Sequence, residues 1–137
     1  MKSVGWRQKS IIWLALVVLM GCSSFAAPAP PLSAAAAQYT LNNWNPAYCK
    51  VVEFYGFYQP GPEGGHTRIA YVLVVNPGEQ SQKQTIYEAR FQLLHRPDGQ
   101  QQWFLTALTS HASGLSRRQG WDNLMIPVKD NPGAPAR

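Results

Sequence analysis

The feature that most constrains the fold is the tetrapeptide Arg96-Pro97-Asp98-Gly99, which stands between two segments rich in aromatic and aliphatic residues. Proline at the second position and glycine at the fourth are typical of a type I turn closed by a glycine bulge. The sequence therefore predicts an antiparallel hairpin between residues 84–95 and 102–110, with Arg96 opposite Gln100.

Counting outward from this turn assigns each pair of facing residues to one side of the hairpin, because side chains alternate along a strand. One side has three wholly apolar pairs and is the predicted core face: Leu93 with Trp103, Phe91 with Leu105, and Ala89 with Ala107. The other side has three mixed pairs: Gln92 with Phe104, Arg90 with Thr106, and Glu88 with Leu108.

The mixed side is a candidate partner-binding face. Phe104 and Leu108 are large apolar residues, and they fall there beside the charges of Arg90 and Glu88. Protein interfaces combine apolar and charged groups in this way. A second explanation is that a loop, residues 111–121, covers the two apolar side chains permanently.

The rest of the predicted domain is also mainly β. Further strands are expected at residues 49–58, 67–75 and 123–129, and the second is apolar on both faces, which favours a central position. The expected fold is a small antiparallel sheet of about five strands, as a sandwich or half-barrel, with room for a short helix at residues 41–47 or 113–119.

The Asp-Gly turn followed by a strand that contains Trp103 resembles the closing hairpin of cone-shaped α+β folds of the cystatin-like kind. Those folds place a helix before or across the sheet. No segment has apolar residues at helical spacing over a sufficient length, so the sequence favours a sheet without such a helix.

The N-terminus has the pattern of an export signal. Lys2, Arg7 and Lys9 precede an unbroken apolar run of ten residues, Ile11 to Met20. A transmembrane helix needs about 20 apolar residues, so this run is too short to span a bilayer. A basic start and a short apolar core instead predict a signal peptide at residues 1–21.

The end of that run, Leu19-Met20-Gly21-Cys22, resembles the lipobox of bacterial lipoproteins, although Met20 departs from the small or β-branched residue usual at its position. The resemblance implies cleavage between Gly21 and Cys22 and acylation of Cys22, palmitate included, which would anchor the chain to a membrane. Ser23, where an Asp would retain such a protein at the inner membrane, implies the outer membrane, with the domain facing the periplasm. Cys49 is then the odd cysteine, expected to be free and buried.

The mature chain divides into three parts. Residues 22–38 are the lipidated cysteine and a tether rich in Ala and Pro, in which Pro28, Pro30 and Pro31 oppose a helix. An extended tether of this kind reaches up to about 45 Å. Residues 39–130 are the β-rich domain, and residues 131–137 are a tail expected to fray.

Charge and motifs give no sign of catalysis. From Cys22 onward there are nine bases against seven acids, and nothing favours nucleic acid as a partner. His66, His95 and His111 lack metal-ligand spacing, so no catalytic residue, metal or cofactor is predicted. The expected function is that of a non-enzymatic accessory or structural component of the cell envelope that binds a protein. The alternatives are a glycan or small-ligand module that uses surface aromatics and, less favoured, a hydrolase.

Overall fold

The computed structural model describes residues 29–59, 64–110 and 119–133. They form these elements in chain order: helix α2 (Ala34–Trp44), strand β1 (Lys50–Tyr58), the 3-10 turn η1 (Gly64–His66), and strands β2 (Thr67–Val75), β3 (Gln84–His95), β4 (Gln101–Ser110), β5 (Gly120–Trp121) and β6 (Ile126–Pro127). The predicted β class is confirmed. The predicted fifth strand, 123–129, is shorter: it is β6, of two residues, and the separate short strand β5 precedes it.

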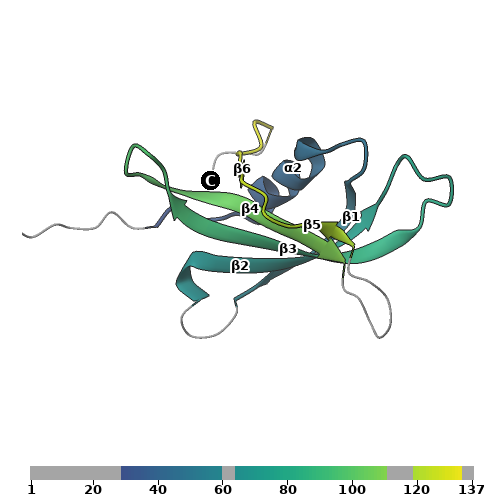
Figure 1. The fold of residues 1–137 in the computed structure, drawn as a ribbon, viewed down its shortest axis with the longest axis horizontal. Coiled ribbons are helices and arrows are strands. Elements are labelled where there is room, and N and C mark those ends of the chain that lie inside the picture. The colour runs from purple at the N-terminus through teal and green to yellow at the C-terminus, as the bar shows by residue number, and fades with distance from the viewer. Residues whose placement is uncertain (1–28, 60–63, 111–118, 134–137) are drawn as a thin grey trace, which may run out of the picture.

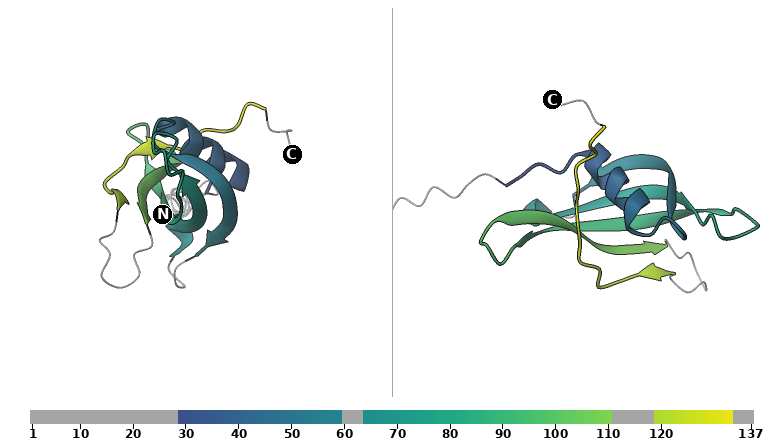
Figure 2. Two further views of the ribbon diagram at one scale, coloured as in Figure 1. Left: turned by 90° about the vertical axis from the view of Figure 1, so that its right-hand side faces the viewer. Right: turned by 90° about the horizontal axis from the view of Figure 1, so that it is seen from above.

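The strands form one open antiparallel sheet in the order β1-β2-β3-β4-β5, with β6 also paired to β4 (Figure 1). β2 is central, as its apolar character on both faces predicts. The sheet curves around its inner face, where α2 lies (Figure 2). The described strands therefore form a single curved layer with a helix against it, rather than a sandwich of two sheets.

Helix α2 begins in the segment predicted to be tether. Ser33 is its N-cap, with an extended backbone and a hydroxyl that accepts a hydrogen bond from the Ala36 amide at 3.1 Å. The prolines end at Pro31, and the four alanines that follow have the highest helix propensity of any residue. The helix thus begins about five residues before the predicted start of the domain at residue 39, and the helix that the sequence disfavoured does cross the sheet.

The composition of α2 explains why the sequence did not reveal this helix. Its buried face is made of Ala36, Ala37, Thr40 and Leu41, of which only Leu41 is a large apolar residue. Amphipathic periodicity is read from large apolar side chains, and alanine and threonine contribute little to it. The Thr40 hydroxyl donates to the Ala36 carbonyl at 2.8 Å, which satisfies it inside the core.

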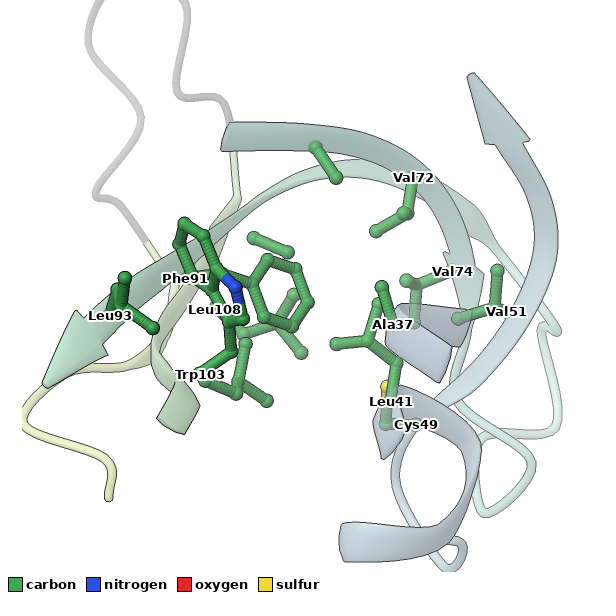
Figure 3. Packing of buried hydrophobic residues seen from close by; sticks show 13 residues of the cluster. Ala37, Leu41, Cys49, Val51, Val72, Val74, Phe91, Leu93, Trp103 and Leu108 are labelled. Carbon is green, nitrogen blue, oxygen red and sulfur yellow. The ribbon is translucent and has the colours of Figure 1, made fainter. Parts of the chain in front are cut away.

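The core lies between α2 and the inner face of the sheet (Figure 3). Val72 and Val74 come from β2, Phe91 from β3 and Leu105 from β4, and Leu41 of the helix packs against them. Phe91, Leu41, Leu105 and Val72 are fully buried. Each such side chain contributes roughly 1.5–3 kcal/mol when it leaves water, so this cluster holds helix and sheet together.

Residues 124–129 join the β4 edge to the helix. The Leu124 amide donates to the Thr106 carbonyl at 2.9 Å, and the Val128 amide donates to the Trp103 carbonyl at 2.9 Å. The Lys129 amide then donates to the Thr40 hydroxyl at 3.0 Å. This segment covers most of the β4 edge.

The predicted hairpin is confirmed at its turn and over its first pairs. The Arg96 amide donates to the Gln100 carbonyl at 2.7 Å, and Gly99 has φ +83°, as a glycine bulge requires. Leu93 pairs with Trp103, Gln92 with Phe104 and Phe91 with Leu105, all as predicted. Beyond Phe91 the register shifts by one residue: Arg90 pairs with Ala107, Ala89 with Leu108, and Glu88 with Thr109.

Candidate functional site

The register shift corrects the predicted partner face. Thr106 is the extra residue of a β-bulge, and its hydroxyl donates to the Arg90 carbonyl at 3.3 Å. One inserted residue reverses the side to which every later side chain points. Leu108 is therefore a core residue with no exposed surface, and Figure 3 shows it beside Phe91. The prediction that placed Leu108 on the partner face is wrong.

The other three residues of that face lie on the outer side of the sheet. Arg90 and Glu88 are on β3, and their side chains form an ion pair at 3.7 Å. Arg90 is exposed, whereas only 14% of the Glu88 side chain is exposed. Phe104 is half-buried on β4 beside Pro127 of β6. The pair is long, and the Arg90 end of it reaches solvent, so Arg90 can make further contacts.

Three large side chains from β1, β2 and β3 extend this outer face. Tyr58 is 56% exposed, Ile86 47% and Tyr71 36%. Strand pairing places Tyr71 beside Glu88. Tyr58 pairs with Ile69, which in turn pairs with Arg90. We call Tyr58, Tyr71, Ile86, Glu88 and Arg90 the outer patch. Aromatic side chains around an arginine are typical of the residues that dominate protein interfaces.

A groove of about 530 Å³ adjoins the outer patch. It lies between the outer side of β3 and β4 and a wall formed by residues 122–125; its lining residues are Arg90, Gln92, Leu94, Thr106, Ala107, Asp122, Asn123, Leu124 and Met125. The bulge sets Ala107 opposite Arg90, and this small side chain leaves room there. Met125 is 60% exposed at the wall. The groove therefore presents polar and apolar groups together.

A smaller pocket of about 150 Å³ lies at the opposite end of the strands, where Tyr87, Glu79 and Trp121 line it. Trp121 packs edge-on against Trp44 with ring centroids 5.3 Å apart. Burial, and then the negative charges that Cys49 and Glu79 carry when ionised, raise the pKa of Tyr87. Its phenol therefore stays protonated as a donor and carries no special reactivity.

Cys49 is free and buried immediately before β1, as predicted. Burial raises the pKa of its thiol to about 11, and the Trp44 indole opposes this shift in part. The buried Trp44 Nε1 makes no hydrogen bond among the described residues, so its opposing effect on the Cys49 thiol is weak and the effect of burial prevails. A thiol that stays protonated near neutral pH is a poor nucleophile.

The raised pKa of Cys49 predicts a loss of stability at alkaline pH. The unfolded thiol ionises near 9, whereas the folded thiol ionises near 11, so the unfolded state loses its proton first. The free energy of unfolding should then fall by about 1 kcal/mol per pH unit between those values. Urea titrations at pH 8, 9.5 and 10.5 should show this slope in the wild type and a shallower one in Cys49→Ala, which keeps the contribution of Tyr87. Equal slopes in both proteins would contradict the assignment of this loss of stability to Cys49.

The described histidines lie far from Cys49. His66 ends η1 and His95 ends β3, at the end of the sheet where β3 turns into β4, whereas Cys49 is next to the turn between β2 and β3. His111 lies outside the described residues. Within the described ranges, no group of three or more His, Cys, Asp or Glu residues is placed to hold a metal ion.

Sequence reasoning missed Tyr58, Tyr71, Ile86 and the wall at residues 122–125. Alternation along β2 places Tyr71 and Val72 on opposite faces of the sheet. A strand that is apolar on both faces does not reveal which of these faces is inward. The wall depends on Asn123, whose φ of +56° bends the chain. Asparagine is among the few residues that adopt this conformation readily, so Asp122-Asn123 was a usable turn signal.

Comparison with known protein families, with curated proteins and with solved structures finds no match. Among the described residues, no helix has the length and apolar character needed to cross a membrane. The predicted cleavage and lipidation site at Gly21 and Cys22 lies outside the described residues, as does most of the loop 111–121.

Proposed function

We propose that this chain is a lipoprotein of the cell envelope, held by lipid on Cys22, that binds another protein through its outer patch and has no catalytic role of its own. The lipobox resemblance supports the anchor, with the outer membrane as its destination and the periplasm as the compartment that the domain faces. The outer patch carries the binding proposal, because it exposes Tyr58, Tyr71 and Ile86 around Arg90.

The arrangement of these groups favours a protein as the partner. Tyr71 and Tyr58 offer large rigid contact surfaces with little conformational entropy to lose. Arg90 stands between them and the groove, with a guanidinium that can pair with a carboxylate of the partner. Its ion pair with Glu88 is long, at 3.7 Å, so Arg90 can contact a carboxylate of the partner while it stays beside Glu88.

Charge reversal at Arg90 tests this proposal with a matched control. Arg90→Glu should weaken partner binding at least tenfold, because it places two like charges side by side in the patch. Arg96→Glu is the control: the Arg96 side chain is 46% exposed against 47% for Arg90, and each arginine pairs with one acid, Asp98 at 48% exposed and Glu88 at 14%. Arg96→Glu should retain the wild-type unfolding midpoint, whereas Arg90→Glu sets a second carboxylate beside the largely buried Glu88 and should lower it, so binding is compared at a temperature where both variants are folded.

Site-specific photo-crosslinking in intact cells provides the measurement. A photoreactive residue at Tyr71 should give one discrete crosslinked product, and Arg90→Glu should abolish it while Arg96→Glu leaves it. The same probe at Asn43, which is exposed on α2 at the other face of the sheet, should give none. Equal products from positions 71 and 43, or a product that survives Arg90→Glu, would refute the outer patch as the binding site.

A second candidate function is a glycan or small-ligand module, and the groove favours it. Arg90, Gln92, Asp122 and Asn123 supply donors and acceptors beside Leu94 and Met125. Ligand sites combine a few polar groups with apolar walls in this manner. Retention on purified cell-wall material, lost in Asp122→Ala, together with no crosslinked protein from Tyr71, would favour this candidate.

A further inference from the structure

The chain enters the domain at one defined place. The indole N–H of Trp103 donates to the Pro30 carbonyl at 2.7 Å, and Leu32 packs against the core immediately before the N-cap Ser33. Residues from Pro30 onward are therefore part of the folded body. Seven residues, 23–29, separate the body from Cys22, far fewer than in the tether to residue 38 expected from composition.

The place of entry is near one end of the sheet. Trp103 pairs with Leu93, two residues before β3 ends, and the turn 96–100 follows. Figure 1 shows the chain arriving at the end of the sheet where β3 turns into β4. We call this the entry end; His66, Arg68, His95 and residues 96–100 lie there. The turn 76–83 between β2 and β3 lies at the other end.

The reach of the chain restricts how the domain can stand on a membrane. The eight Cα–Cα steps from Cys22 to Pro30 span at most about 29 Å, the length of the fully extended chain. From Leu93 to Gln84 the strand β3 rises nine residues, or about 30 Å, and the turn 76–83 extends further. An upright domain with turn 76–83 on the bilayer would hold Pro30 out of reach of a cysteine anchored at the surface.

We propose that the entry end is a membrane-facing surface that rests on the lipid headgroup layer; this inference depends on the lipid anchor proposed above. Pro30, pinned at Trp103, holds that end close to the bilayer and directs the turn 76–83 away from it.

The side chains at the entry end suit a headgroup layer. Arg68 and Arg96 are basic, His66 and His95 are exposed, and Asp98 is the one acid among the described residues of this end. The Arg68 guanidinium lies 5.6 Å from the centroid of the Trp103 ring, so the residue that pins the chain also positions a cation there. Cations near a bilayer surface attract anionic headgroups, and the covalent anchor makes the contact intramolecular.

The test compares two fluorescent probes on the full-length lipidated protein. Gln100→Cys places a probe at the entry end and Ser81→Cys places one at the other end; both positions are exposed, and the native Cys49 is buried. The proteins are reconstituted in vesicles of phosphatidylethanolamine and phosphatidylglycerol with nitroxide-labelled headgroups. Quenching should be at least threefold stronger at position 100 than at position 81.

A longer tether is the control. Twenty Gly and Ser residues inserted between Phe25 and Ala26 extend the reach beyond the length of the sheet, so the ratio of quenching should fall toward one. Equal quenching in the protein without the insertion, or stronger quenching at position 81, refutes the orientation. Protein that fails to float with the vesicles refutes the lipid anchor itself, and flotation is scored before the probes are compared.

Discussion

Leu108→Asp should leave the domain unfolded, whereas Phe104→Asp should leave it folded. Leu108 has no exposed surface and packs in the core cluster, so an aspartate there would be a buried charge without a partner. That penalty is several kcal/mol, against a total stability of about 5–15 kcal/mol for a domain. Phe104 is half-buried on the outer side, where a carboxylate can reach water. Phe104→Asp should therefore lower the free energy of unfolding by no more than about 1–2 kcal/mol.

Circular dichroism and urea denaturation measure this difference. Leu108→Ala is the graded version, because it removes apolar volume without adding charge, and it should cost about 2–5 kcal/mol. Without the bulge at Thr106 the two residues would share one face and their aspartate variants would behave alike. A folded Leu108→Asp protein with a normal unfolding midpoint would contradict the observed register.

Cys22→Ala should abolish lipidation and leave the chain either uncleaved or soluble. Two or three acyl chains each contribute about 0.8 kcal/mol per buried methylene, so their loss removes the proposed hold on the bilayer. Mass spectrometry of the wild-type protein from membranes should find Cys22 as an acylated N-terminus, and Cys22→Ala should lack the acyl mass. Cys49→Ala is the control and should keep it. An intact, unacylated N-terminus on the wild-type membrane protein would refute the anchor.

Local pattern was sufficient for the strands and the turn. β2 and β3 have the bounds that their composition predicts, and the turn at residues 96–99 has the predicted geometry. These features depend on neighbours in the sequence: proline presets one dihedral angle, glycine permits a positive φ, and β-branched and aromatic residues favour extended chain. Pairing close to the turn follows from the turn itself, which is why Leu93 was placed correctly.

Tertiary structure decided the rest. The bulge at Thr106 carries no mark in the sequence, and it moved Leu108 into the core, put Ala107 opposite Arg90 and so opened the groove. The outer patch requires the pairing of β1, β2 and β3, which joins residues distant in the chain.

By itself, the sequence determined the mainly β class, the hairpin and the buried Cys49, because each depends on residue type and local spacing. Only the folded chain decided that an alanine-rich segment is a core helix, since its small side chains gain from close packing against the sheet rather than from their own hydrophobicity. The fold also decided where the chain enters the domain, because the hydrogen bond from Trp103 to Pro30 joins residues 73 apart in the sequence.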